Sequence, residues 1–481
     1  MNHKVIRYIL FKVITLEGIL MILPAIVAVI YGETDSFSVF LGLILACVVV
    51  GSLGSRKKPE NMVFYAKEGF VVTSLSWILL SVIGAFPFVL TGTIPSYVDA
   101  LFETISGFTT TGASILTGVD GMEKSVQFWR TFSHWIGGMG VLVFMIAVVP
   151  MADGYSMHLM RAESPGPVVG KFVPKVKDTA KILYGIYFGF TLVETILLMI
   201  SGMNLYEALT LTFSTVGTGG FAITNAGIGG YKIASQVIII IFMALCGVNF
   251  SVYYFLLTKR PKEAVRCDEM RWYFGVMLIS ASLIAINIYR AGITSTPFLA
   301  FHHALFTVTS IMTTTGFGTL DFNVWPEFSR TLLFILTLLG ACAGSTGGGF
   351  KFSRILIVCR TVKNELSFVI HPKSVKRVYM DGHSVESTTV KSVFNYLGIY
   401  ILIMLVSVLL ISLDGFSFET NVTAVAATLN NVGPGLGMVG TTGNFSQFSA
   451  FSKIVMMFDM LAGRLELLPM LILLSVRTWK K

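Results

Sequence analysis

Long apolar stretches alternate with short polar segments along the whole chain. A helix needs about 20 apolar residues to cross the roughly 30 Å hydrocarbon core of a membrane. We therefore predict an all-α, multi-pass membrane protein. Its ten spans are expected at 7–32, 36–53, 67–92, 126–150, 180–202, 232–257, 272–291, 328–358, 391–412 and 450–476. The first is too long for the core of a signal peptide and lacks a small-residue cleavage site, so we expect it to remain in the protein.

Four shorter apolar segments lie between these spans, at 97–108, 204–215, 298–312 and 419–429. Each is too short to cross a membrane, and each runs into a cluster of Gly, Thr or Asn. A short helix that ends in an irregular glycine loop between two spans is typical of a re-entrant segment.

The glycine loops recur at a spacing of about 100 residues. With Gly112, Gly219, Gly316 and Gly433 as anchors, the separations are 107, 97 and 117 residues. In the second loop Gly217, Gly219 and Gly220 are all candidates for the anchor position, and register with the other loops favours Gly219. We predict a two-helix hairpin at 1–60 followed by four pore repeats. The repeats are expected at 61–155, 156–265, 266–370 and 371–481.

The composition agrees with a membrane protein and excludes other classes. Hydrophobic residues make up 54% and charged residues 13%, against about 25% charged in soluble domains. The five cysteines form no CxxC pair, so neither a zinc site nor a disulfide framework is indicated. No clustered His, Asp and Glu set and no soluble catalytic domain supports an enzyme. The net charge of +9 marks the sidedness of loops and not a nucleic-acid partner.

Basic residues predict the orientation. With both termini and the loops after spans two, four, six and eight placed inside, that side holds 25 of the 35 Lys and Arg residues and the outside holds six. The positive-inside rule therefore predicts cytoplasmic termini and contact of the basic loops with anionic lipid. The glycine loops then lie outside, where eleven acids against six bases would attract cations.

Four glycine loops around one axis can present rings of carbonyl oxygens, which replace the hydration shell of an alkali cation. Glycine opens the backbone conformations that such a ring needs, and the preceding short helices aim their partly negative ends at the axis. The spacing distinguishes these loops from ordinary small-residue packing seams. The candidate filter residues are Thr110, Thr111, Gly112, Val216, Gly217, Thr218, Gly219, Thr314, Thr315, Gly316, Asn431, Val432 and Gly433.

Two further features lie within predicted spans. Five glycines at 340–349 each destabilise a helix by about 1 kcal/mol relative to Ala, so span eight is expected to break into an intramembrane loop. Phe350 separates Gly349 from Lys351, which excludes a nucleotide-binding P-loop. Arg464 is costly within a membrane and is a functional candidate by default. It is either a barrier to a passing cation or a structural group neutralised by Glu466, Asp459 or loop carbonyls.

These motifs together resemble the Trk/Ktr/HKT superfamily of potassium transporters. They are the four glycine loops, the run from Trp129-Arg130 through His134-Trp135-Ile136-Gly137-Gly138-Met139-Gly140, the run Gly344-Ser345-Thr346-Gly347-Gly348-Gly349-Phe350-Lys351, and Gly463-Arg464-Leu465-Glu466. The N-terminal hairpin is most similar to the bacterial TrkH/TrkG branch, and the resemblance covers essentially the whole chain. Ser114 and Phe317 depart from the pattern outside the filter glycines.

The resemblance implies a fold of four channel-like repeats and a homodimer with one pore in each protomer. It implies a bacterial inner-membrane location and a cytosolic nucleotide-binding ring of the TrkA type, which binds NAD or ATP. The gate is then expected at Gly347, Gly348 and Gly349, with Lys351 and Arg464 as charged barriers.

The expected function is potassium uptake, with K⁺ as the transported ion and no covalent cofactor. In the plant relatives a Ser in place of the first-loop glycine is associated with sodium preference, so Gly112 argues for potassium. A sodium-permeable or cation-coupled symporter is the alternative, and the sequence leaves channel-like and proton-coupled transport open. A transporter built from inverted repeats fits poorly, because the four units run in the same sense.

Overall fold

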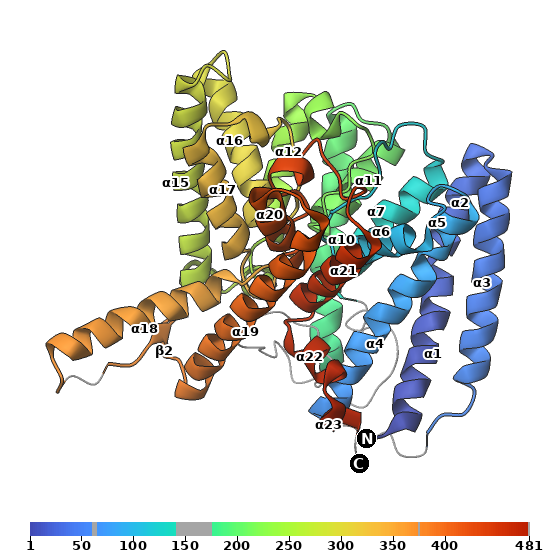
Figure 1. Ribbon diagram of the computed structural model, residues 1–481, viewed down its shortest axis with the longest axis horizontal. Helices are drawn as coiled ribbons and strands as arrows, with labels where there is room; N and C mark the ends of the chain where they lie inside the picture. Colours follow the sequence, from blue (N-terminus) through green and yellow to red (C-terminus); the bar gives the residue numbers. More distant parts are fainter. Residues whose placement is uncertain (60–64, 141–175, 374–375, 480–481) are drawn as a thin grey trace.

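The computed structural model describes residues 1–59, 65–140, 176–373 and 376–479. The described chain is mostly helical, as predicted, and both termini lie at the same end of the molecule (Figure 1). Its strands β1 (Tyr379–Met380) and β2 (His383–Ser384) form a short antiparallel hairpin. The rest is a bundle in which helices from distant parts of the sequence surround a central group of short helices.

The N-terminal hairpin packs against one side of this bundle (Figure 1). It consists of α1 (His3–Leu20), α2 (Ile22–Tyr31) and α3 (Thr34–Gly54). A Cβ on Gly51 would lie 2.7 Å from the Thr15 nitrogen and 2.8 Å from the Phe11 carbonyl oxygen. Glycine therefore allows the backbones of α1 and α3 to approach closely, as at other helix pairs in membranes.

Each of the four units that follow begins with a long helix and continues with a short one. The long helices are α4 (Ala66–Gly84) with α5 (Phe86–Leu90), α10 (Val176–Ile200), α15 (Asp268–Arg290) and α19 (Ser387–Ile411). The short helices are α6 (Tyr97–Phe108), α11 (Leu205–Val216), α16 (Pro297–Met312) and α20 (Phe418–Leu429). Each short helix begins after a polar side chain that caps a free backbone N–H, from Ser96, Asn204, Thr296 or Ser417. The four short helices lie where the sequence predicts them, to within one residue at each end.

The last helical segment of three of the four units is broken within the described residues. The broken segments are α12 (Ile233–Cys246) with α13 (Phe250–Leu257), α17 (Glu327–Leu339) with α18 (Phe352–Ile370), and α21 (Ala450–Arg464) with α22 (Leu468–Leu474). The first unit ends in α7 (Lys124–Gly138), and residues 141–175 lie outside the described residues. The predicted break at 340–351 is confirmed. The continuous spans predicted at 232–257 and 450–476 are wrong, since α12 and α13 meet at 91° and Glu466 and Leu467 are left-handed.

The described residues contain six helices long and apolar enough to cross a membrane, or seven if α12 and α13 form one bent span. The other predicted spans are the broken 328–358 and 450–476 and the segment 126–150, of which 141–150 lie outside the described residues. Most of the basic loop that follows this fourth predicted span lies outside them as well. The short elements α14 (Pro261–Val265), α23 (Val476–Trp479), η1 (Gly227–Gly230), η2 (Phe322–Val324), η3 (Ser412–Asp414) and η4 (Gly437–Val439) complete the fold.

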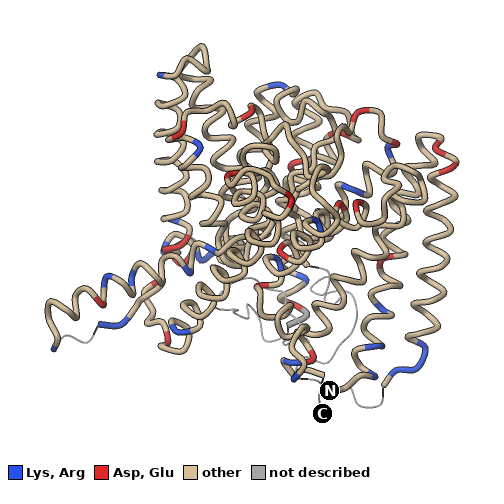
Figure 2. Tube along the Cα trace, in the orientation of Figure 1, with Lys and Arg blue, Asp and Glu red and all other residues tan. Residues whose placement is uncertain are grey.

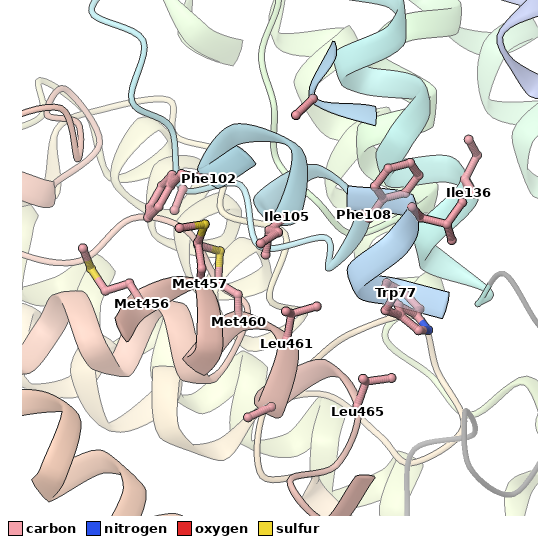
Figure 3. Packing of buried hydrophobic residues seen from close by; sticks show 14 of the residues in the cluster. Trp77, Phe102, Ile105, Phe108, Ile136, Met456, Met457, Met460, Leu461 and Leu465 are labelled. Carbon is pink, nitrogen blue, oxygen red and sulfur yellow. The ribbon is translucent and has the colours of Figure 1, made fainter. Parts of the chain in front are cut away.

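Packing around the first short helix joins the first unit to the last. Phe102 and Ile105 of α6 lie beside Met457 and Met460 of α21 and are fully or almost fully buried (Figure 3). This contact closes the chain of units into a ring, because the first unit touches the second where α7 meets α11 and the last where α6 meets α21.

Candidate ion pathway

The four glycine loops share one backbone conformation. In each loop a left-handed residue stands two positions before a left-handed glycine, with the residue between them outside that region. The pairs, with their φ angles, are Thr110 (54°) and Gly112 (80°), Thr218 (54°) and Gly220 (82°), Thr314 (58°) and Gly316 (85°), and Asn431 (54°) and Gly433 (94°). Left-handed Thr and Asn residues are strained, and strain of this kind persists only where the surroundings enforce it.

This conformation corrects the register of the second loop, in which Gly220 and not Gly219 corresponds to the other glycines. Hydrogen bonds to the short helices agree. The amide of Thr111 donates to the Ser106 carbonyl at 2.9 Å, and that of Gly219 donates to the Ser214 carbonyl at 2.8 Å. Gly219 therefore stands in the position of Thr111. Val216 is the last residue of α11 and Gly217 is its C-cap, so both candidates precede the filter positions. The sequence does contain a signal for this register, since a serine stands six residues before Gly112, Gly220 and Gly316 alike.

The loops form a closed ring in the order of the sequence. At each glycine an added Cβ would collide with a carbonyl oxygen of the neighbouring loop. Gly112 faces the carbonyl of Gly219, Gly220 that of Thr315, Gly316 that of Val432, and Gly433 that of Thr111. Four backbone segments therefore approach one another as closely as the absence of side chains allows. The arrangement places four equivalent carbonyls around one axis.

On one side the ring opens into a cavity of about 270 Å³. Its walls include all four glycines and the segments that follow them. Asp321 also lines the cavity, and its carboxylate accepts hydrogen bonds from the hydroxyls of Thr441 (3.1 Å) and Thr442 (3.2 Å). A carboxylate at this entrance favours cations over anions.

On the other side the ring meets the loop that interrupts the third unit. The amide of Gly348 donates to the hydroxyl of Thr314 at 2.6 Å. A Cβ on Gly348 would lie 2.6 Å from the Asn430 carbonyl oxygen, and one on Gly347 would lie 2.7 Å from that of Thr313. The loop thus packs directly against the third and fourth filter loops, where it can obstruct an ion that leaves the ring.

The two charged groups expected at the gate make hydrogen bonds to backbone. Lys351 is buried, and its ammonium donates to the carbonyl of Gly347 within its own loop. Arg464 donates from Nη1 to the Thr346 carbonyl (2.7 Å) and from Nη2 to the carbonyls of Gly137 (2.5 Å) and Gly138 (2.7 Å). Arg464 therefore ties the gate loop to the end of α7, which supports the expectation that loop carbonyls neutralise it.

The acids named beside Arg464 have other partners. Glu466 forms an ion pair with Arg354 of α18, and Asp459 accepts a hydrogen bond from Ser407 at 2.7 Å. Two ion pairs were not predicted, that of Arg354 with Glu466 and that of Arg130 with Glu103. An arginine within an apolar segment was the available signal for each of these pairs.

The chemistry of the ring is that of neutral oxygen atoms. The described residues contain no group of three or more His, Cys, Asp or Glu side chains that could hold a resident metal ion. Backbone carbonyls and threonine hydroxyls suit weakly held alkali cations, which must bind and then leave. The arrangement can therefore select and pass a cation.

Comparisons with known proteins point to one family. The model of the TrkH family, described as a cation transport protein, matches residues 35–480. The chain is 32% identical over 485 residues to the Trk system potassium uptake protein TrkH of Escherichia coli K12, and 29% identical over 481 residues to TrkG of the same strain. These matches cover 100% and 99% of each chain. The crystal structure of the potassium transporter TrkH from Vibrio parahaemolyticus superimposes with a TM-score of 0.89 at 30% identity, over 100% of both chains.

Proposed function

The chain belongs to the TrkH family of cation transport proteins, and we propose that it takes up K⁺ across the inner membrane of a bacterium through the pore enclosed by its four filter loops. The observation that carries this proposal is the closed ring, in which each filter glycine faces the carbonyl that precedes the next glycine. Carbonyl dipoles around one axis replace the water that a K⁺ ion loses on entry. The proposed filter is completed around Gly112, Gly220, Gly316 and Gly433 by Thr110, Thr111, Thr218, Gly219, Thr314, Thr315, Asn431 and Val432.

The gate of this pore is the loop 340–351 with its glycines Gly347, Gly348 and Gly349. Its contacts with Thr314 and Asn430 support this role, because the loop occupies the side of the ring away from the cavity. Arg464 holds the loop in place through the Thr346 carbonyl. A movement that separates Arg464 from Thr346 would free the loop to open.

The assembly is a homodimer with one pore in each protomer and a cytosolic nucleotide-binding ring of the TrkA type. The relatives are named as parts of a Trk system, which supports a partner. The charge distribution supports a cytosolic face at the termini, since Lys and Arg are frequent at the end of the molecule where the termini lie (Figure 2).

Flux through the purified protein in liposomes tests the proposal. Uptake of K⁺ and Rb⁺ should exceed uptake of Na⁺ and Li⁺, because the filter oxygens suit the larger ions. The same measurement with and without a proton gradient separates a channel-like pore from a coupled symporter. Equal uptake of all four ions, or none by folded protein, would contradict selective potassium uptake.

A further inference from the structure

A buried ion pair lies behind the first two filter loops. Glu103 of α6 is fully buried, and its carboxylate accepts hydrogen bonds from the Ser114 hydroxyl (2.9 Å) and the Ile115 amide (2.9 Å). Arg130 of α7 is 3% exposed and donates to the same carboxylate from Nε at 2.7 Å. Glu103 therefore holds the segment that leaves Gly112, and Arg130 holds Glu103.

The guanidinium of Arg130 also reaches the second loop. Its Nη1 donates to the Ala222 carbonyl at 3.1 Å, and its Nη2 donates to the Ser114 hydroxyl at 3.3 Å. Its central carbon lies 3.5 Å from the centroid of the Phe221 ring. Ser114 stands two residues after Gly112, and Ala222 stands two residues after Gly220. One side chain thus connects the equivalent positions of two filter loops.

Other residues on the same face of α7 continue this contact. His134 accepts a hydrogen bond from the Phe221 amide at Nε2 (3.3 Å), while its Nδ1 lies 2.7 Å from the Gly107 carbonyl. Gln127 donates to the Ile223 carbonyl at 2.8 Å. Spacings of three and four residues place Gln127, Arg130 and His134 on one helix face. The three consecutive residues 221–223 are thus each held through their backbone by a side chain of α7.

These contacts restrict how the filter can deform. The loops form neither helix nor sheet, so their backbone groups need side-chain partners. Bonds to charged groups are shorter and roughly twice as strong as neutral ones. In the third loop the corresponding carbonyl, that of Gly318, accepts instead from the neutral backbone amide of Ile228 at 3.3 Å. The first and second loops are therefore tied together by charge, at the level of the cavity entrance.

We propose that Arg130 and Glu103 are positioning residues that set the selectivity of the pore for K⁺ over Na⁺. The inference rests on the proposed function. A Na⁺ ion is smaller than K⁺, so the ring carbonyls of Thr111 and Gly219 must move inward to coordinate it. The pair opposes this movement because it fixes the segments that follow both glycines. Glu103 is fully buried, and Arg130 reaches the cavity wall with its charge paired to Glu103. Each acts on the filter through the backbone that it holds.

Arg130→Lys in the full chain tests the proposal. Lysine keeps the charge, but one ammonium cannot satisfy three acceptors arranged around a planar fork. We expect the ratio of K⁺ to Na⁺ uptake in liposomes to fall about tenfold, the effect of losing one charge-assisted hydrogen bond. Potassium uptake per folded protein should change much less than the ratio. Ser114→Ala, which removes a hydroxyl bonded to both Glu103 and Arg130, should shift the ratio in the same direction by less.

A partly buried ion pair supplies the control. Lys453 of α21 donates to Asp99 of α6 at 2.6 Å and to the Ser446 carbonyl at 3.0 Å, and neither acceptor is a filter residue. Lys453→Gln should lower thermal stability and leave the ratio unchanged.

If the wild type prefers K⁺ and folded Arg130→Lys has the same ratio of K⁺ to Na⁺ uptake, the proposal is overturned. If Arg130→Lys does not fold, an unchanged ratio in Ser114→Ala would overturn it instead. A wild type that does not prefer K⁺ would contradict the proposed function, which is a different result.

Discussion

Two adjacent glycines of the second loop lack a side chain for different reasons. Gly220 is left-handed at φ 82°, and a Cβ there would collide with the backbone carbonyl of Thr315. Gly219 is outside the left-handed region, and its Cβ would collide with the imidazole of His134. The equivalent positions of the other loops carry Thr111, Thr315 and Val432. Gly219 therefore makes room for His134, whereas Gly220 makes room for the neighbouring loop.

Double variants that combine a substitution of each glycine with His134→Ala distinguish these two reasons. We expect Gly219→Ala to destabilise the protein, and His134→Ala to relieve part of that effect, with a coupling of about 1 kcal/mol or more. Gly220→Ala should lower the ratio of K⁺ to Na⁺ uptake, and His134→Ala should not restore it. Thermal unfolding and liposome uptake measure the two effects. If the losses of stability caused by Gly219→Ala and His134→Ala simply add, the imidazole of His134 does not occupy the space beside Gly219.

Arg464→Ala is expected to raise K⁺ flux with little change in selectivity. A fixed positive charge about 5 Å from a passing K⁺ ion costs roughly 3 kcal/mol at an effective dielectric constant of 20. The carbonyls of Thr346, Gly137 and Gly138 offset part of this cost. Removing the side chain also frees the gate loop from α7. The measurement is flux per folded protein, with Arg464→Lys as the control that keeps the charge. A fall in flux per folded protein after Arg464→Ala would remove Arg464 from the pore.

At the scale of elements, the short helices could be predicted and two of the helix breaks could not. The short helices have polar caps and an apolar length that are visible in sequence. The break between α12 and α13 depends on tertiary contacts, because the Phe250 amide donates to the Gly344 carbonyl and the Cys342 amide donates to the Gly247 carbonyl, each at 3.0 Å. These bonds join the second unit to the gate loop of the third. No local pattern reveals backbone pairs about 95 residues apart.

The break after α21 shows the same limit with a different residue type. Glu466 and Leu467 are left-handed without being glycines, a conformation that neither favours alone. Pro469 was a local signal, since it stands at the second position of α22. The ion pair of Glu466 with Arg354 connects this break to α18. The glycines of 340–349, in contrast, predict their break directly.

Deletion of Gly347, Gly348 and Gly349 tests the gate loop as an element. The loop lies against Thr314 and Asn430, so a shorter loop should obstruct the pathway less and raise passive K⁺ flux. The ratio of K⁺ to Na⁺ uptake should change little, because the deletion removes no filter oxygen. Liposome flux measures both, after gel filtration has shown that the variant is folded and dimeric. Zero flux through a folded dimer would contradict the assignment of the gate.

At the scale of the whole molecule, the order of the four loops around the axis follows from the repeat, but their contacts do not. The sequence predicts four equivalent glycines, and the structure adds that each meets a carbonyl of the next loop. The charge distribution could be predicted, since it depends only on which loops share a side. The projection of α18 away from the bundle, seen in Figure 1, could not, because its apolar residues suggested part of a span.

The exposed basic segment that follows α18 is the proposed docking surface for the nucleotide-binding ring. Lys373, Lys376 and Arg377 are exposed and lie between α18 and the hairpin β1–β2. Arg360 of α18 connects this hairpin to α15, because it donates to the Tyr379 carbonyl and forms an ion pair with Asp268 at 2.9 Å. Reversing all three charges should weaken co-purification with a TrkA-type ring roughly tenfold or more, since each exposed pair contributes up to about 1 kcal/mol. Reversal of Arg56, Lys57 and Lys58, which are also exposed, is the matched control and should have little effect. Attraction to anionic lipid alone would make the two triple variants equivalent. Retained binding of the first variant at moderate salt would place the ring on another surface.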